Sequence, residues 1–429
     1  MSLEEQCYLL NYLIESDTEG YFKDHINLIK LELDWHIYHY GEHFALKRNE
    51  VRGGFSIRKK IIKLYNIYAA LRNNHCDSNK KNVLSSVYFP FFNDALKKAG
   101  INPVSPYWAP MGKKVAGNAA IIRSVRGITA TLKNASFQQL ISTSFQQEIK
   151  DYQELISTFL QEQPYQALFL YTDQYFQAKV SIKAFKQQNR PSFILSHGLP
   201  GIYSSYIDSK ADYLMVWGNK IKENYIKAGF SEEKILVSGH PAYQQRNYTQ
   251  QTLRFDLSDV LVLAKAVSAH QHSYSPIVCD RGVLVIYLLR IKEVLQSLGV
   301  KRARLRPHPT MSVDWLLSFL GDDFFTVDTQ PLPASLQRSS LVVGPTSTVL
   351  LESVFHGVNY TIFEPVFEGK DLTGYTLVPP FDGSDDNIPV AFTDSELLRM
   401  LKNKESVNPE LVNTYLAPFD ITAIQHLFC

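Results

Sequence analysis

A group of polar residues in the second half of the chain has the types and spacing of an anion-binding site. A Gly-Pro turn at 344–345 leads into three consecutive hydroxyl residues and the start of a predicted helix. Backbone N–H groups and the dipole at a helix N-terminus favour negative charge, and Ser and Thr hydroxyls add donors. Basic side chains at the end of an earlier predicted strand complete a predicted phosphate cradle. Its members are Arg306, His308, Pro309, Thr346, Ser347 and Thr348.

Two further residues extend this predicted site. Glu352 lies one turn along the same predicted helix, where its carboxylate would accept a hydrogen bond from a ribose hydroxyl. Lys265 follows another predicted strand and adds a basic side chain to the set. Simpler interpretations stay open: Ser347 and Thr348 would then only cap the helix, and His308 would be an ordinary loop residue.

The first half of the chain offers a carboxylate and an imidazole at comparable positions. Asp173 comes just after the predicted strand 167–171, and His197 comes just after the predicted strand 191–196. A partly buried carboxylate there would act as a general base on an acceptor hydroxyl, and His197 would orient it or bind the acceptor. The alternative for Asp173 is a helix cap, because a predicted helix begins at Tyr175.

The elements that carry these residues alternate between strands and helices from residue 82 onward. Short connections between buried strands and helices are typical of a parallel sheet that is covered on both faces. The polar stretch 243–257 is typical of a linker. The alternation of strands and helices restarts after it. The predicted strands are 82–89, 167–171, 191–196, 211–217, 235–238, 259–264, 301–306, 340–343 and 359–363.

The predicted fold class is therefore α/β, with two Rossmann-like domains that face each other across a cleft. Ligands of open α/β sheets bind outside the carboxyl ends of the strands, where the predicted site residues lie. A helical N-terminal extension precedes the two domains, and a C-terminal helix follows them. The predicted limits are 1–80 for the extension, 81–245 and 246–410 for the domains, and 411–429 for the last helix.

Composition excludes several classes of protein. The net charge of +2 argues against a dedicated binder of nucleic acid, which needs a strong basic excess. The four cysteines are scattered without the spacing of a zinc site or of a disulfide framework, which favours a reducing compartment. The first residues carry acids rather than a basic region, so we expect no signal peptide. No apolar run reaches the length of a membrane span, and we expect a cytoplasmic protein.

One segment could still bring the protein to a membrane. Residues 47–65 combine Lys and Arg with Ile, Leu and Phe in an amphipathic pattern. Such a segment either packs on a neighbouring domain with a solvated basic face, or attracts anionic lipid at the inner face of the cytoplasmic membrane.

The motifs of several enzyme classes do not occur in the sequence. It contains no D-x-D triplet, no G-x-G-x-x-G, no Walker A motif and no G-x-S-x-G elbow. His270 and His272 lack a third partner for a metal ion. We therefore expect neither a metal nor a resident cofactor.

Four sequence segments resemble the GT-B glycosyltransferases that assemble bacterial surface polysaccharides. The resemblance covers about residues 82–410. It lies in Ser196-His197-Gly198, in Trp217-Gly218 with Gly239-His240-Pro241, in Arg306-Pro307-His308-Pro309, and in Pro345-Thr346-Ser347-Thr348 with Glu352. The last two segments are similar to the His-Pro and Ser/Thr motifs of transferases that use CMP-activated sialic acid or Kdo (3-deoxy-manno-octulosonic acid).

This resemblance implies an inverting, metal-independent glycosyltransferase of capsule or lipopolysaccharide synthesis, with a nucleotide-sugar co-substrate and a glycan or lipid-linked acceptor. It assigns the donor to the second domain and the acceptor to the first, with Asp173 as the base. The sialyltransferases carry an acidic pair followed by Gly near their base. Here Gln174 and Tyr175 follow Asp173, which weakens the sialic acid alternative and favours Kdo or a neighbouring group.

Two other functions stay open. The Arg-x-His-Pro and Ser/Thr elements also resemble those of CDP-glycerol phosphotransferases of teichoic acid synthesis, which would attack phosphorus instead of carbon. A chain with this fold could also be a non-catalytic carbohydrate-binding subunit of an assembly. Turnover of CMP-sugars or of CDP-glycerol separates these possibilities.

Overall fold

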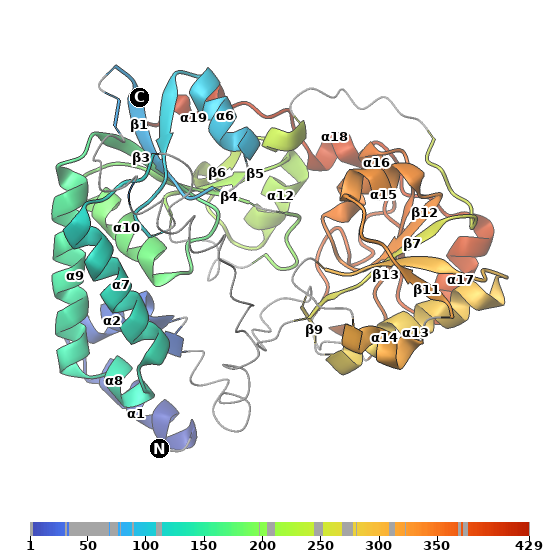
Figure 1. Ribbon diagram of the computed structural model, residues 1–429, viewed down its shortest axis with the longest axis horizontal. Coiled ribbons are helices and arrows are strands. Elements are labelled where there is room, and N and C mark those ends of the chain that lie inside the picture. Colours follow the sequence, from blue (N-terminus) through green and yellow to red (C-terminus); the bar gives the residue numbers. More distant parts are fainter. Residues whose placement is uncertain are drawn as a thin grey trace.

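The computed structural model shows two α/β domains side by side, joined by more than one stretch of chain (Figure 1). The first domain carries the N-terminus, and the chain returns to it at the C-terminus. The structure describes residues 3–30, 32–33, 68, 76–77, 79–87, 90–108, 114–196, 198–203, 211–243, 252–267, 278–279, 281–308, 314–321, 323–367, 370–371 and 376–428.

The sheet of the first domain is parallel throughout, with the strand order β2-β1-β3-β4-β5-β6. This is a doubly wound order, which reverses direction between β1 and β3. The strands are β1 (Lys81–Ser85), β2 (Ile101–Val104), β3 (Tyr165–Leu170), β4 (Ser192–Leu195), β5 (Tyr213–Val216) and β6 (Ile235–Val237). The helices around them are α6 (Pro90–Lys98), α7 (Ala119–Asn134), α8 (Phe137–Leu140), α9 (Thr143–Gln161), α10 (Phe176–Gln187) and α12 (Asn219–Lys227).

The sheet of the second domain is also parallel and has the order β11-β10-β7-β12-β13-β16. When the six strands of this sheet are renumbered 1 to 6 along the chain, their order is 3-2-1-4-5-6, which is that of the Rossmann fold. The strands are β7 (Val260–Leu263), β10 (Ala303–Arg306), β11 (Phe325–Val327), β12 (Leu341–Gly344), β13 (Tyr360–Phe363) and β16 (Val390–Ala391). The helices are α13 (Arg281–Ser297), α14 (Asp314–Leu320), α15 (Leu332–Arg338), α16 (Val349–Phe355) and α17 (Asp394–Asn403).

The two sheets confirm the predicted pair of Rossmann-like domains, the arrangement called GT-B. Every residue of β7, β12 and β13 is buried, as expected for strands covered by helices on both faces. Glycine also ends two helices of the first domain, since Gly100 and Gly229 follow α6 and α12 with φ of 77° and 93°. The predicted domain limits stay predictions.

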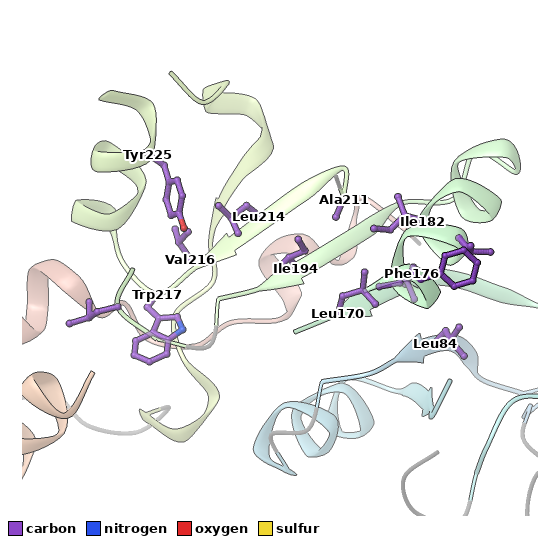
Figure 2. Close-up of a cluster of buried hydrophobic side chains, with 14 of the residues drawn as sticks. Leu84, Leu170, Phe176, Ile182, Ile194, Ala211, Leu214, Val216, Trp217 and Tyr225 are labelled. Carbon is purple, nitrogen blue, oxygen red and sulfur yellow. The ribbon is translucent and has the colours of Figure 1, made fainter. Parts of the chain in front are cut away.

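Hydrophobic clusters cover both faces of each sheet. One cluster fills the space between the first sheet and α7, α9, α10 and α12, and it continues into β12, α16 and α18 (Leu411–Tyr415). Figure 2 shows part of it, from Leu84 on β1 to Trp217 at the end of β5. The core therefore runs from one domain into the other, through residues near Trp217 and Tyr415.

The C-terminal segment differs from its prediction as one helix over 411–429. It forms α18 and α19 (Thr422–Gln425), with a non-helical stretch between them that includes Pro418. Ile421, Ile424 and Phe428 pack against the outer face of the first sheet, and Ala417 N–H donates to the Trp217 carbonyl. The chain thus returns from the second domain to close the first.

This return explains two glycines that the sequence analysis assigned to motifs. A Cβ on Gly218 would collide with the backbone of Tyr415 and Leu416, and a Cβ on Gly239 would collide with the backbone of Ala417 and Pro418. Gly239 also has a φ of 70°, which favours glycine. Both glycines therefore have a packing role beneath the C-terminal segment.

We expect Gly218→Ala to lower the free energy of unfolding by about 1–3 kcal/mol, because backbone cannot move aside as a side chain can. Gly127→Ala is the matched control, since Gly127 lies within α7 and the added Cβ would meet nothing within 4 Å beyond the neighbouring backbone of its own helix. That control should melt at or above the wild-type temperature, because Ala is the better helix former. Equal melting temperatures for wild type and Gly218→Ala would contradict this packing.

At the N-terminus the structure contains α1 (Leu3–Glu15) and α2 (Tyr21–Leu28), in agreement with the predicted helical extension. The basic segment 47–65 lies outside the described residues. Within the described part of the chain, no helix combines the length and the apolarity needed to cross a membrane.

Candidate functional site

The carboxyl ends of the two sheets meet at one direct contact. The loop after β4 reaches the turn after β12, where the Leu199 N–H donates to the Thr348 Oγ1 over 3.0 Å. A Cβ on Gly198 would collide with the same hydroxyl, so glycine permits this close approach. The strand ends predicted to carry the chemistry of the two domains therefore adjoin each other.

Several predicted site residues follow strands at the points where the strand order reverses. In the second sheet this switch point lies between β7 and β12, which are followed by Lys265 and by 345–348. In the first sheet it lies between β1 and β3, and Asp173 comes soon after β3. Ligands of open α/β sheets bind at switch points, so the topology places these residues where a ligand is expected.

The turn 344–348 is held from below by β13 and the residue that follows it. The Tyr360 hydroxyl donates to the Pro345 carbonyl over 2.5 Å. The Glu364 Oε1 accepts the Thr346 N–H, also over 2.5 Å. Tyr360 and Glu364 are completely buried, so neighbouring side chains fix the shape of the turn.

Lys265 forms an ion pair with Glu364. Its Nζ lies 2.5 Å from the Glu364 Oε2, and both side chains are fully buried. A buried ion pair keeps its geometry only when both partners stay charged and hydrogen-bonded. Lys265 thus supports the turn through Glu364, and a direct contact of Lys265 with a ligand stays a prediction.

Sequence reasoning missed Glu364. The signal was available, because Glu364 is the first residue after the predicted strand 359–363 and so obeys the rule that selected Lys265. What the sequence did not show is that the two charges pair within the core.

The turn differs in one detail from the predicted anion cradle. A cradle would offer its backbone N–H groups to an anion, but the Thr346 N–H donates inward to Glu364. Helix α16 begins at Val349, and Thr348 at its N-cap makes no side-chain cap bond, because its hydroxyl faces Leu199. The Ser347 Oγ does accept the Val349 N–H over 3.2 Å, as the simpler capping interpretation predicted.

Arg306 lies on the far side of β7 from this turn. Its Nη1 donates to the Gln330 carbonyl over 2.7 Å and lies 3.2 Å from the Asp328 Oδ1. Burial alone would raise the pKa of Asp328, but the hydrogen bonds from Ser335 and Arg304 and the Arg304 charge outweigh it and lower that pKa. Asp328 is therefore ionised and fixes Arg306 beside the start of α15.

Glu352 on α16 is the predicted site residue whose carboxyl is influenced by the Arg306 charge. Burial raises the pKa of this carboxyl, while the nearby Arg306 charge and a hydrogen bond with the Tyr243 side chain oppose the rise. The Arg306 charge therefore acts on the pKa of Glu352, although the two residues come from different elements. Tyr243, in the segment that leaves the first domain, was not among the predicted residues.

The histidines near this region are neutral at pH 7. Burial lowers the pKa of His308 below its usual value. Burial also lowers the pKa of His240 to about 4, and its ring lies 4.2 Å from the Trp217 ring. A neutral imidazole would contact a phosphate as a hydrogen-bond donor, without a full positive charge.

Asp173 is almost fully buried, with 2% of its surface exposed. The N-cap of α10 is Tyr175, two residues later, and no side-chain cap bond forms there. Asp173 is therefore not itself the N-cap residue of α10. His197 and Pro309, the remaining predicted site residues, lie outside the described residues.

Two cavities lie away from these residues. One, of about 550 Å³, is lined by residues of α2, α9 and α10, and the other, of about 380 Å³, lies beside β10 and β11. Neither is lined by a predicted site residue, although Asp328 and Gln330, the partners of Arg306, line the second. Over the described ranges, no group of three or more His, Cys, Asp or Glu side chains could hold a metal ion.

Comparison with known proteins found similarity only among solved structures. No family model and no curated protein sequence matches the chain. A putative UDP-N-acetylglucosamine 2-epimerase from Listeria monocytogenes is 14% identical. The match covers 79% of this chain and 93% of the epimerase chain, with a TM-score of 0.47. The lipopolysaccharide outer core galactosyltransferase WaaB is 11% identical, with coverages of 81% and 97% and a TM-score of 0.43. Anabaena HepE in complex with UDP and glucose is 12% identical, with coverages of 81% and 97% and a TM-score of 0.40.

Proposed function

We propose that the protein is a nucleotide-sugar-dependent glycosyltransferase that needs no metal ion. One observation carries this proposal: predicted site residues follow the strands at the switch points of both Rossmann-like sheets, and the carboxyl ends of the sheets touch at Leu199 and Thr348. A donor on the second domain and an acceptor on the first would then lie side by side.

In the proposed reaction, Asp173 takes the proton from an acceptor hydroxyl as that oxygen attacks the anomeric carbon of the donor sugar. The bond between this carbon and the phosphate oxygen breaks, and the nucleotide leaves from the opposite face, so the configuration inverts. Arg306, His308 and Ser347 would stabilise the negative charge on the leaving phosphate. Each such preorganised donor typically contributes ~3 kcal/mol to the transition state.

The finer assignment is a CMP-linked donor of the Kdo type and a glycan or lipid-linked acceptor. Two features of the sequence support it: the His-Pro and Ser/Thr motifs, and the residues Gln174 and Tyr175 after Asp173. The basic segment 47–65 would bring the enzyme to anionic lipid, where a lipid-linked acceptor is found.

The test begins with nucleotide binding. We expect CMP to raise the melting temperature, since a ligand at ~100 times its dissociation constant adds ~2.7 kcal/mol of stability. Arg306→Ala should weaken this binding. The same melting measurement is made with CDP and with UDP.

The second step follows nucleotide release from CMP-Kdo, CMP-sialic acid and CDP-glycerol with a panel of acceptors, in the presence and absence of EDTA. Release from a CMP-sugar that survives EDTA supports the proposal. Release from CDP-glycerol alone would make the protein a polyol-phosphate transferase. Binding without any turnover would favour a non-catalytic carbohydrate-binding subunit, and loss of activity with EDTA would reveal a metal requirement.

A further inference from the structure

Arginine occurs at every second position from 302 to 306, at the strand β10 of the second sheet. Successive side chains of a strand point to opposite faces, so Arg304 and Arg306 share one face of this sheet. Arg302, just before β10, lines the cavity of about 380 Å³ together with Arg304 and with Arg338 at the end of α15. The Arg304 side chain is only 11% exposed, and arginine is rarely so covered unless its charge is paired.

Two aspartates pair with these arginines. The Asp259 carboxylate joins two of them, with its Oδ1 2.6 Å from the Arg304 Nε and its Oδ2 2.8 Å from the Arg338 Nε. Asp328 joins Arg304 and Arg306 in the same way, and its side chain is almost completely buried. The ion pairs therefore form one chain in which arginine and aspartate alternate, with an arginine at each end.

This chain of ion pairs leaves positive charge at the cavity. Arg338 donates to Asp259 through its Nε, its side chain is 69% exposed, and no described residue accepts from its Nη groups. Arg302 is exposed and has no ion pair or hydrogen bond with any residue that the structure describes. The hydroxyl residues Thr326 and Thr329 line the same cavity and add neutral donors. Because both aspartates of the lining are already paired, the lining favours a negatively charged ligand.

We infer that this cavity binds the phosphate group of a small phosphorylated molecule, which Arg302 and Arg338 contact. A guanidinium presents a planar fork of N–H donors that matches phosphate oxygens, and Asp259 holds the fork of Arg338 before the ligand arrives. The volume of the cavity leaves room for the phosphate and for the molecule that carries it. None of the described residues that line the cavity belongs to the predicted donor site, so this inference does not depend on the proposed function.

The first measurement follows the Arg338 side chain directly. In full-length protein labelled with nitrogen-15 at the arginine Nε, the Arg338 signal is identified by its loss in Arg338→Gln. Inorganic phosphate is then added at constant ionic strength, and we expect this signal to shift and to reach saturation. The control signal is that of Arg399, whose side chain is 56% exposed and pairs with Glu405 outside the cavity. A shift of Arg338 that does not saturate, or an equal shift of both signals, would overturn the inference.

The second measurement compares the phosphate affinity of three variants that each remove one exposed positive charge from the second domain. We expect Arg302→Gln and Arg338→Gln each to bind phosphate about tenfold more weakly than wild type, the usual effect of a lost hydrogen bond to a charged group. The affinity is read from whichever of the Arg302 and Arg338 signals remains. Arg399→Gln is the matched control and should bind as wild type does. Equal affinities in all three variants would show that phosphate responds to overall charge and not to this cavity.

Two further titrations separate this cavity from the donor site and from a lipid surface. Saturating CMP should leave the phosphate response of Arg338 in place, and its loss would mean that the cavity is part of the donor site. Vesicles that contain phosphatidic acid should not shift the Arg338 signal, and binding to them without binding to inorganic phosphate would overturn the assignment to a small molecule. A wild-type protein that binds no nucleotide would refute the proposed function, while the phosphate titration would still decide the role of the cavity.

Discussion

Replacing Asp173 with asparagine should leave the protein folded and still able to bind nucleotide, but should lower turnover by ~10²–10⁴, the usual contribution of a positioned general base. Asparagine has nearly the same shape as aspartate and cannot accept the proton of an acceptor hydroxyl. The position of Asp173 after β3, at the switch point of the first sheet, is the reason for this expectation.

The measurement pairs a thermal melt with a rate assay on wild type and Asp173→Asn. Asp212→Asn serves as the matched control, since Asp212 lies before β5, at the opposite end of the same sheet. It accepts the N–H and the hydroxyl of Ser192 over 2.9 and 2.7 Å. The control should lose stability and keep its rate per folded molecule. A rate for Asp173→Asn within a few fold of wild type would show that another group, such as His197, is the base.

The second large effect concerns the buried pair beneath the turn 344–348. Lys265→Met should lower the free energy of unfolding by about 3–5 kcal/mol, because it leaves the Glu364 carboxylate buried without its cationic partner. For a domain of this size that corresponds to a fall of roughly 6–20 °C in melting temperature. Nucleotide binding should weaken as well, because Glu364 holds the Thr346 N–H.

Two comparison variants separate the charge from the packing. Lys265→Met combined with Glu364→Gln removes the unpaired charge and keeps an acceptor for Thr346, so it should be more stable than Lys265→Met alone. Lys183→Met removes an ion pair with Asp24 whose side chains are 43% and 67% exposed, and should change stability by at most about 1 kcal/mol. If Lys265→Met melted like Lys183→Met, the buried pair would not support the turn as we propose.

The position of Tyr243 shows why such a residue is not visible in the sequence. It lies at the start of a polar stretch that is typical of a linker, and Phe355, on which its ring stacks, lies more than a hundred positions further along the chain. Nothing in the local pattern distinguishes it from the other tyrosines. Only the docking of the first domain on α16 brings its ring against Phe355.

The sequence by itself determined the local structure and the strand ends. Buried strands of parallel sheets are continuous apolar runs, so β3, β7 and β13 agree with the predicted ranges within two residues. Because connections are short and strands parallel, the residues after each strand gather at one sheet edge, and this makes Asp173 and Thr346 candidates without any structure.

The tertiary structure decided the strand order and the partners of each charge. Strand order depends on contacts between segments far apart in the sequence. It places β7 between β10 and β12, so that Arg306 lies across β7 from the turn and pairs with Asp328. The same long-range packing buries Lys265 against Glu364 and brings the backbone of Tyr415 onto Gly218. The type of a residue determines which bonds it can form. Its actual partner depends on which distant segment the fold brings within reach, and the local sequence does not specify that segment.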